Sequence, residues 1–378
     1  MGYFKKPNLK KIDYIILEIM FILICAGLYC IFHISASNPK KSDLFTKQLL
    51  GFVLGFITIV VIQFFDYRFI CKLSPILYLG ICAVLAYTFK RGLEVNHVRR
   101  WIPVAGISLQ PSELAKIILI LFLAFLCNVF KEKQKKFYPV FILAAATALP
   151  AFLILKEPHL SPCIVLAVIF CIVVLVSGIS YKVIMTLVVI IAPLLATIFI
   201  GVGVFNWNIP LIKPYMVKRV LIHFTDGDAV DNTAGKYQQD HSISAIEAGG
   251  AYGKALTKDN TNKNYQIIYS NESDFIFAGI AEEYGFVGCC ILIFLYLIMV
   301  LRCLKIAAHA PDLMGRIIAT AVSSLLTFQA FIHLGVTTDI LPNTGMPFPF
   351  ISYGLTNLVS SMIAIGLVIN IGQDCKNN

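Results

Sequence analysis

Residues 271–301 read N-E-S-D-F-I-F-A-G-I-A-E-E-Y-G-F-V-G-C-C-I-L-I-F-L-Y-L-I-M-V-L. The polar part of this stretch ends at Asp274, and the residues that follow, up to Leu301, are almost all apolar. A helix needs about 20 apolar residues to span the hydrocarbon core of a bilayer. The stretch therefore predicts a membrane-spanning helix over residues 275–301, with one carboxylate at its edge and two more, Glu282 and Glu283, inside it.

Apolar runs of this kind recur along the whole chain. Of its 378 residues, 58% are hydrophobic and only 14% are charged, a composition that excludes an ordinary soluble protein. A membrane β-barrel would instead show alternating segments of about 10 residues. The expected fold is an all-α polytopic membrane protein with about ten transmembrane helices, over residues 13–36, 49–65, 73–89, 114–130, 138–155, 161–178, 183–206, 275–301, 317–341 and 352–373.

The distribution of lysine and arginine predicts the orientation. With the N-terminus inside, the inner segments hold 15 of these residues, and the outer loops other than 207–273 hold 8. Short inner loops carry the excess of positive charge, so we expect both termini inside the cell. Residues 1–378 then form a single transmembrane domain, with 207–273 as a long extracytoplasmic loop between helices 7 and 8.

The outer side is nevertheless unusually basic. These charges are either tolerated on the surface or, as we favour, meet an anionic ligand, because arginine and lysine suit phosphate groups. We expect membrane lipids as partners, and no nucleic acid. The basic residues of the outer side include Lys90, Arg91, Arg99, Arg100, Lys213, Lys218 and Arg219.

Residues 99–116, R-R-W-I-P-V-A-G-I-S-L-Q-P-S-E-L-A-K, predict the start of a helix. Pro111 suits the first helical position, and Glu113 suits the first turn. Glu113 and Lys116 are three residues apart and can face each other. Taken alone, the stretch is a helix entry with Trp101 in the interfacial aromatic belt. Its three cations can equally hold a lipid phosphate: Arg99, Arg100 and Lys116.

Asp274 has two interpretations. It can cap the helix, since Asp is a good N-cap and an acid suits a helix N-terminus. It can also be a functional carboxylate. In a regular helix Glu282 lies about 12 Å deeper and about 80° round from Asp274, and Glu283 lies on nearly the opposite face. Acids inside a span are costly unless they face protein, water or a cation. We expect at least one of the three acids to be functional or partnered.

Three further segments carry structure-breaking residues. Residues 236–254 end in A-G-G-A-Y-G-K, whose glycines permit close backbone approach, without the pattern of a P-loop or dinucleotide site. Residues 344–354, T-G-M-P-F-P-F-I-S-Y-G, predict a broken or re-entrant segment, which must be buried in protein or line a cavity. In the turn 156–162, His159 is more simply a polar turn residue than a metal ligand.

Together these motifs resemble one family. R-R-W-I-P, Q-P-S-E-L-A-K, A-G-G-x-x-G-K, S-D-F-I-F-A-x-x-A-E-E-x-G-F-x-G and L-P-x-T-G-x-P-x-P-F-I-S-Y-G stand in the order and spacing of the SEDS proteins (shape, elongation, division and sporulation). The resemblance runs from about the first helix to the last. Within the family the chain resembles the RodA branch more than the division paralogue FtsW, because its tails are short and A-Y-G-K-A is similar to a RodA motif.

The resemblance implies a peptidoglycan glycosyltransferase of the bacterial plasma membrane. Such an enzyme polymerises lipid II into nascent glycan strands for cell elongation and cell shape, together with a class B penicillin-binding protein as the transpeptidase. It implies Asp274 as the catalytic aspartate, and it carries the family's functional tryptophan onto Trp101 and its polar helix-start residues onto Glu113 and Lys116. Glu282 and Glu283 are expected to be supporting polar residues.

The chemistry is plausible on general grounds. A carboxylate can accept the proton of an attacking sugar hydroxyl. The leaving diphosphate needs cations, supplied by basic side chains or by a divalent metal such as Mg²⁺ or Mn²⁺, whose ligands the sequence does not identify. The candidate basic side chains for substrate binding are Arg100, Lys116, Lys218 and Arg219.

Some positions depart from the family pattern. His159 stands where the family has the aspartate of P-D-L-G, which puts in doubt any metal or polar network that this aspartate serves. Glu247 stands in the usual I-G-S-G-G, and residues 355–357 replace the usual G-S-S.

Two other functions stay open: a flippase or other transporter of lipid-linked precursors, and a non-catalytic scaffold for a transpeptidase. A carboxylate at the outer lip favours catalysis, whereas Glu282 and Glu283 keep transport open.

Overall fold

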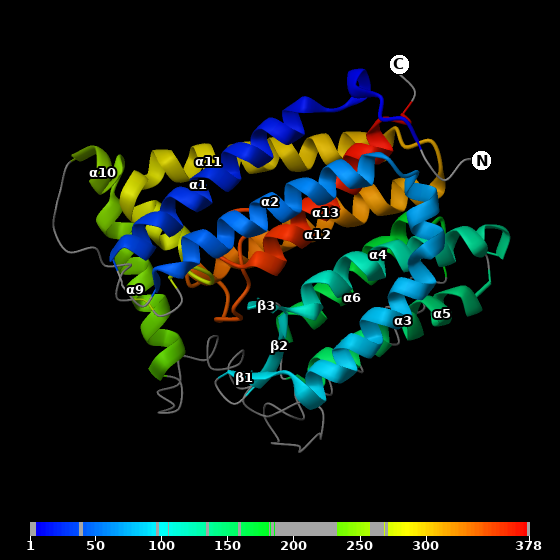
Figure 1. Ribbon diagram of the computed structural model, residues 1–378, viewed down its shortest axis with the longest axis horizontal. Coiled ribbons are helices and arrows are strands. Elements are labelled where there is room, and N and C mark those ends of the chain that lie inside the picture. Colours follow the sequence, from blue (N-terminus) through cyan, green and yellow to red (C-terminus); the bar gives the residue numbers. More distant parts are fainter. Residues whose placement is uncertain are drawn as a thin grey trace. The chain divides into compact units, whose positions relative to one another are not determined.

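The computed structural model describes residues 5–37, 41–95, 98–104, 106–133, 136–157, 160–180, 182, 185, 233–257, 268 and 271–375. Helices dominate this part of the chain (Figure 1). They are α1 (Tyr14–Ser37), α2 (Asp43–Gln63), α3 (Tyr67–Arg91), α4 (Pro111–Val129), α5 (Tyr138–Lys156), α6 (Leu160–Val176), α9 (Thr233–Gly249), α10 (Gly253–Thr257), α11 (Ile276–Ala308), α12 (Leu313–Thr337) and α13 (Leu355–Gly372), with short 3-10 turns at Leu9–Lys11 and Lys131–Lys133.

The predicted membrane helices are confirmed wherever the structure describes them. Eight helices are long and apolar enough to cross a membrane, namely α1 to α5 and α11 to α13, and α6 is a shorter apolar helix. The span predicted over 183–206 lies outside the described residues, apart from Met185. α3 begins at Tyr67 rather than at residue 73, because Pro75 is accommodated inside the helix instead of delaying its start.

A small antiparallel sheet, which the all-α prediction did not include, follows α3. Strands β1 (Leu93–Val95), β2 (Val98–Val104) and β3 (Ile107–Leu109) pair in the order β1-β2-β3. Register pairs include Glu94 with Arg99 and Pro103 with Ser108. The chain then enters α4 through Pro111 at the first helical position, with Glu113 in the first turn, as the sequence predicted.

The chain forms two compact units. Unit 1 contains residues 1–66, 231–309 and 322–378. Its α1 packs on α2 and α11, and α2 packs along α13 (Figure 1). A Cβ added at Gly55 of α2 would lie 2.3 Å from Met362 Sδ of α13, so the helices approach closely through a small residue, as is common between membrane helices. The amide of Asn370 in α13 donates to the carbonyls of Ile62 and Phe65.

Unit 2 contains residues 67–230 and 310–321. In it α3 packs on α4 and α5, and α6 packs on α4 and α5. Tyr78 of α3 donates its hydroxyl to the carbonyl of Ala146 in α5 (2.7 Å). Tyr67 and Arg68, at the start of α3, bind the carboxylate of Asp312 before α12 at 2.8 and 2.6 Å.

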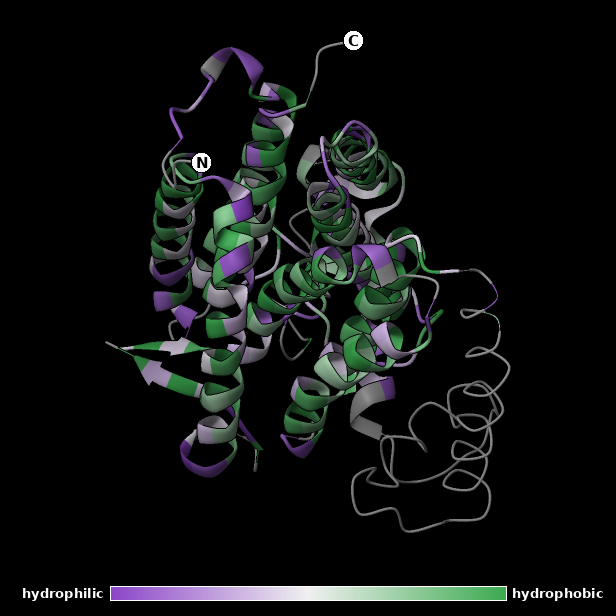
Figure 2. Cartoon of the chain, turned by 90° about the vertical axis from the view of Figure 1, so that its right-hand side faces the viewer, coloured by the Kyte–Doolittle hydropathy of each residue, from purple (hydrophilic) through white to green (hydrophobic). Residues whose placement is uncertain are grey.

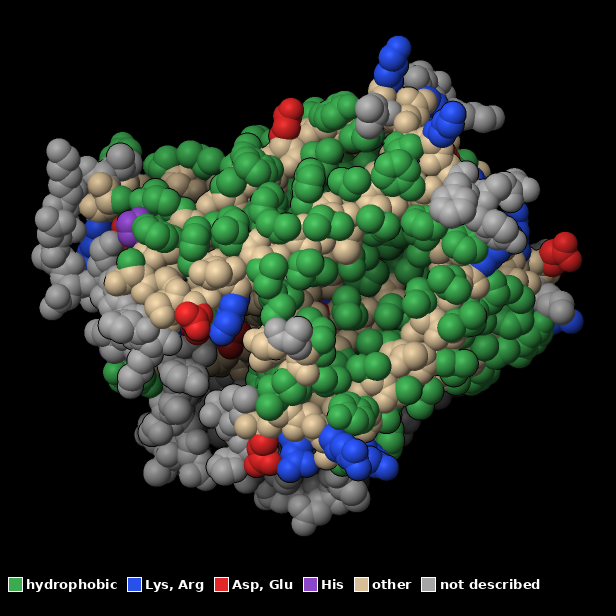
Figure 3. Space-filling view, in the orientation of Figure 1, with side chains coloured by type: hydrophobic (Ala, Val, Ile, Leu, Met, Phe, Trp, Pro, Cys, Tyr) green, Lys and Arg blue, Asp and Glu red, His purple; other side chains and the backbone are tan. Residues whose placement is uncertain are grey.

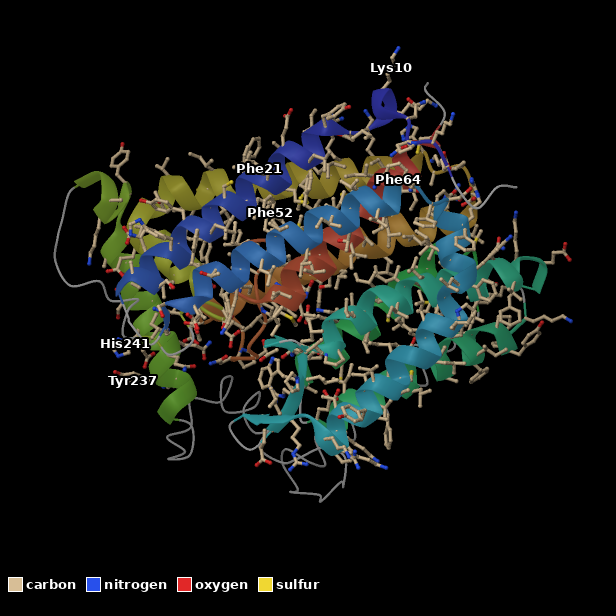
Figure 4. The ribbon with its side chains drawn as sticks, viewed as in Figure 1. Lys10, Phe21, Phe52, Phe64, Tyr237 and His241 are labelled. Carbon is tan, nitrogen blue, oxygen red and sulfur yellow. The ribbon has the colours of Figure 1, made fainter. Side chains whose placement is uncertain are left out.

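The surfaces of the helices are those of a membrane protein. Figure 2 shows the helices coloured mainly as hydrophobic, with hydrophilic residues near their ends. Large apolar side chains such as Phe21 (53% exposed) and Phe56 (52%) stand on the outside of α1 and α2. They form part of a broad hydrophobic face over these two helices (Figure 3), and the rings of Phe21 and Phe52 lie 6.1 Å apart (Figure 4). Exposed apolar side chains of this density suit lipid rather than water.

Candidate active site

Asp274 lies in a turn, residues 271–275, directly before α11. The helix begins at Ile276, its N-cap position is taken by Phe275, and no side chain caps that position. The N-cap position therefore belongs to Phe275 and not to Asp274. Because Asp274 lies outside the helix, the helical angle predicted between it and Glu282 does not apply either. The side chain is half-buried, so its carboxylate keeps some access.

The segment of residues 344–354 lies against this carboxylate. It is non-helical between α12 and α13, as predicted. Gly345 has a φ of +65°, and a Cβ built there would lie 3.2 Å from Asp274 Oδ2. The loop backbone thus approaches the carboxylate more closely than most side chains would allow.

Two hydrogen bonds hold the turn that carries Asp274, and a third supports them. Ser352 Oγ donates to the carbonyl of Ser273 (2.6 Å), and the Tyr353 backbone N–H donates to the carbonyl of Glu272 (2.8 Å). The buried amide of Gln48 in α2 donates in turn to the carbonyl of Ser352 (3.1 Å). The entry to the last helix therefore fixes the backbone directly before the aspartate.

Lys41, which the sequence reasoning missed, contacts the same turn. Its Nζ lies 2.8 Å from Asn271 Oδ1 and 2.6 Å from Glu272 Oε2. The only sequence signal for Lys41 is that it is one of the basic residues of the predicted outer side. The contact brings a cation to the turn and ties the α1–α2 connection to it.

His333 of α12 supports the other side of the loop. It is fully buried, its ring stacks on Phe348 with centroids 5.1 Å apart, and its Nδ1 lies 2.8 Å from the carbonyl of Met346. A carbonyl only accepts, so Nδ1 donates this hydrogen bond. His333 thus positions the T-G-M-P segment.

Glu282 has the cation that its place in a span requires. It is completely buried, and its Oε1 lies 2.7 Å from Lys254 Nζ. Lys254 closes the A-G-G-A-Y-G-K motif, and it was not among the predicted site residues. The expectation that at least one of the acids is partnered is confirmed.

Glu283 lies on another face of α11 and lines a small pocket between α1 and α11. Tyr29, Cys30 and His33 of α1 and Tyr284 of α11 share this pocket. The two glutamates therefore face different surroundings, as the sequence indicated.

In unit 2, Glu113 and Lys116 form a buried ion pair with 2.7 Å between Oε2 and Nζ. Their exposed fractions are 3% and 1%. The predicted pairing of these residues is confirmed. Ser112 beside them is also buried, and its hydroxyl has no hydrogen-bond partner within the described part of the chain.

Trp101 and Arg100 lie on β2, in the same unit. Trp101 is half-buried, and Arg100 donates from Nε to the backbone carbonyl of Glu157 (3.1 Å). The Glu157 side chain is buried, and neither of its carboxylate oxygens has a hydrogen-bond partner among the described residues. Burial raises the pKa of Glu157 to about 8, and the charge of Arg100 opposes this rise only in part.

The predicted site residues thus fall into three groups. Asp274, Glu282 and Glu283 belong to unit 1, whereas Arg100, Trp101, Glu113 and Lys116 belong to unit 2. Lys218, Arg219 and His159 lie outside the described residues. Within the described residues no group of three or more His, Cys, Asp or Glu side chains could hold a metal ion. The divalent cation considered above stays a prediction.

Comparison with known proteins gives the same family as the motifs. A family model described as "Cell cycle protein", FtsW/RodA/SpoVE, matches residues 14–377. The chain is 30% identical to stage V sporulation protein E of Bacillus subtilis, over 96% of this chain and 97% of the relative. It is 29% identical to the probable peptidoglycan glycosyltransferase FtsW of Geobacter metallireducens (98% of each chain) and 26% identical to the peptidoglycan glycosyltransferase RodA of Treponema pallidum (95% and 97%).

Solved structures agree with this match. A peptidoglycan synthase complex that coordinates polymerization and crosslinking contains a chain with a TM-score of 0.77 and 26% identity, covering 96% of this chain and 98% of that one. RodA of Thermus thermophilus has the same fold, with a TM-score of 0.68 and 22% identity over 98% of this chain and 100% of that one. Relatives from all three branches match at similar identity, so the preference for the RodA branch stays a prediction. The chain belongs to the FtsW/RodA/SpoVE family, the SEDS family that its motifs resemble.

Proposed function

We propose that the chain is a peptidoglycan glycosyltransferase that polymerises lipid II at the outer face of the plasma membrane, with Asp274 as its catalytic base. The named activities of its relatives support the reaction class. The observation that carries the assignment of the base is the placement of Asp274. It is a half-buried carboxylate outside the end of a membrane helix, in a turn fixed by Ser352 and Tyr353.

For this reaction the Asp274 carboxylate must lie close to the acceptor hydroxyl and must be ionised. The hydroxyl oxygen of the acceptor sugar forms a bond to the anomeric carbon of the donor, while the bond from that carbon to the diphosphate oxygen breaks. The lipid diphosphate leaves with the electron pair, and the hydroxyl proton passes to Asp274. Arg100 of unit 2, and Lys218 and Arg219, remain our candidates for binding the diphosphate. Lys116 is buried in its ion pair with Glu113.

The assignment is tested by lipid II polymerisation with the purified full chain. Asp274→Asn keeps the shape of the side chain and removes its basicity, so we expect a loss of about 10²–10⁴-fold in turnover. Asp240→Asn, the same change at an exposed acid of α9, should leave turnover unchanged. Full activity of the Asp274 variant would overturn the assignment.

We also propose that a class B penicillin-binding protein is the transpeptidase partner. The similar chain in a complex that coordinates polymerization and crosslinking supports this. Polymerisation should rise when a co-purified partner of this class is present, and a partner that fails to bind the chain would contradict the proposal.

The pairing of Glu282 with Lys254 weighs against a transporter. A coupling acid must exchange its proton or ion, whereas Glu282 is buried in a close ion pair. A scaffold without activity is separated from the enzyme by the Asp274 experiment, since a scaffold would tolerate the substitution.

A further inference from the structure

The pocket between α1 and α11 carries chemistry that glycosyl transfer does not use. Its lining combines the phenol rings of Tyr29 and Tyr284 with the Glu283 carboxyl group and the His33 imidazole. The Tyr29 and Tyr284 rings lie 6.3 Å apart and are tilted by 52°, and Tyr29 packs edge-on to His33 at 4.5 Å. Two aromatic rings with a carboxylate between helices form the kind of cage that binds ammonium groups.

The pocket is open toward the outside of the two helices. Tyr29 is 50% exposed, and Phe32 beside it is 51% exposed. Both belong to the apolar outer face of α1, which suits lipid. The pocket therefore faces the acyl region or the headgroups of the bilayer rather than the core of unit 1.

The pocket lies within about two turns of the C-terminal end of α1 and of the N-terminal end of α11. Tyr29 and His33 lie in the last turns of α1, which ends at Ser37, and Glu283 and Tyr284 lie in the first turns of α11. Tyrosines at this level are ordinary members of the interfacial belt. An ionisable acid in a span is not ordinary, and by default it marks a functional site with a partner.

The chemistry of the lining selects the ligand. A phosphate would meet the negative charge of Glu283, so an anionic lipid group does not suit the pocket. An ammonium group suits the carboxylate and the electron-rich faces of both tyrosines. We propose that this pocket binds the primary ammonium of a phospholipid headgroup, as in phosphatidylethanolamine. The inference rests on the membrane location of the family and not on the catalytic role of Asp274.

The test measures which lipids stay bound to the full chain. The protein is extracted from vesicles of equal parts phosphatidylethanolamine and phosphatidylglycerol, and the retained lipids are counted by native mass spectrometry. We expect phosphatidylethanolamine to be enriched about tenfold, the factor that about 1.4 kcal/mol supplies. Glu283→Gln and Tyr29→Leu should each abolish most of this enrichment.

Matched controls separate the pocket from the general surface. Glu18→Gln removes an exposed acid near the other end of α1, and Tyr252→Leu removes a tyrosine that is 63% exposed beyond α9. Both should keep the enrichment. Tyr29 is half-exposed, so Tyr29→Leu should fold. It therefore tests the pocket even where Glu283→Gln fails to fold.

Further outcomes decide the source of the ammonium. Equal enrichment in the wild type and in both pocket variants overturns the proposal, and so does retention of N-acetylated phosphatidylethanolamine, which has no positive charge. Displacement of the phospholipid by lipid II with a free stem-peptide amine, but not by lipid II with that amine acetylated, would assign the pocket to the substrate and overturn the phospholipid. Lipid retention is measured without turnover. The test of the pocket therefore stays valid even if the chain does not polymerise lipid II.

Discussion

Gly345 is the residue on which the geometry of Asp274 depends most directly. Its φ of +65° lies in the left-handed region, where a side chain costs roughly 1–2 kcal/mol. The position of its missing Cβ is 3.2 Å from Asp274 Oδ2, so a methyl group there would push the carboxylate by a few tenths of an ångström. Glycine at this position is explained by both constraints at once.

We therefore expect Gly345→Ala to lower turnover in lipid II polymerisation by roughly 10–100-fold, since small misplacements of a catalytic group are this costly. Gly250→Ala is the matched control: its φ is +52°, but nothing lies within 4 Å of its Cβ position. It should suffer backbone strain without losing turnover. An equal loss in both variants would show that strain, and not contact with Asp274, is responsible.

Glu157 predicts a pH dependence of stability. Its pKa is raised from 4.5 to about 8 in the folded chain, so between these values the folded state binds more protons than the unfolded state. The stability that it contributes is fully present below pH 4.5 and is lost as the pH rises through about 8. Glutamine cannot ionise, so Glu157→Gln should remove this decline.

Thermal unfolding in detergent at about pH 5.5 and about pH 8.5 measures the effect. The drop in Tm between the two values should be about 2–4 °C larger for the wild type than for Glu157→Gln. Glu94→Gln alters an exposed acid paired with Arg99 and should leave the wild-type drop unchanged. A drop that is equal in wild type and Glu157→Gln would contradict a buried, proton-binding carboxyl.

At the scale of elements, the joint between α10 and α11 organises unit 1. α11 is broken at Gly285, with a φ of +65° and a ψ of −169°. The N–H groups that follow, of Phe286 and Val287, donate to the carbonyls of Gly250 and Ala251 in the turn between α9 and α10 (2.9 and 3.1 Å). The break is tolerated because protein groups satisfy the backbone that it frees.

Side chains have no room in this joint. A Cβ at Gly253 would lie 2.2 Å from the carbonyl oxygen of Glu283, and one at Gly285 would lie 2.4 Å from the Gly253 nitrogen. Gly249 and Gly253 of A-G-G-A-Y-G-K serve backbone-to-backbone contact with a membrane helix. The adjacent Lys254 then reaches the buried carboxylate of Glu282.

This joint makes a prediction about stability. Lys254→Met leaves Glu282 buried without its cation and should lower the free energy of unfolding by about 3–5 kcal/mol, whereas Lys254→Met with Glu282→Leu should recover most of the loss. Denaturant unfolding in micelles measures both. Lys47→Met, which removes an exposed pair with Asp43 at 3.9 Å, should change little. A single Lys254 variant as stable as the wild type would refute the structural role of the pair.

The same elements show what could be predicted from the sequence. Local patterns sufficed for the membrane helices, for the pairing of Glu113 with Lys116 and for the irregular segment 344–354, because each depends on neighbouring residues. The partner of Glu282 is 28 residues distant, on a glycine-rich turn, and no local period indicates it. The helical projection from Asp274 was wrong because Asp274 lies in a turn, residues 271–275, and not in the helix.

At the scale of the whole chain, the two termini lie together. Lys5 pairs with Asp374, the Asn8 N–H donates to Gln373 Oε1 (3.0 Å), and Lys11 Nζ lies 3.4 Å from the carbonyl of Cys375. The opposite end of unit 1 holds α9, where Tyr237 and His241 lie far from Lys10 in Figure 4. Residues near the two termini therefore lie at the same end of unit 1. The even number of predicted spans places both on one side of the membrane, and this topology stays a prediction.

The excess of positive charge predicts that this side is the cytoplasm. Lys10 and Tyr237 are both exposed, so cysteine can replace either without disturbing the core. In intact cells a membrane-impermeant maleimide should label Tyr237→Cys beyond the level of the parent chain, and Lys10→Cys only after permeabilisation. The reverse pattern would place α9 inside the cell. The first turns of α11, on which α9 packs, would then face the cytoplasm together with Asp274, and polymerisation at the outer face would be impossible for this carboxylate.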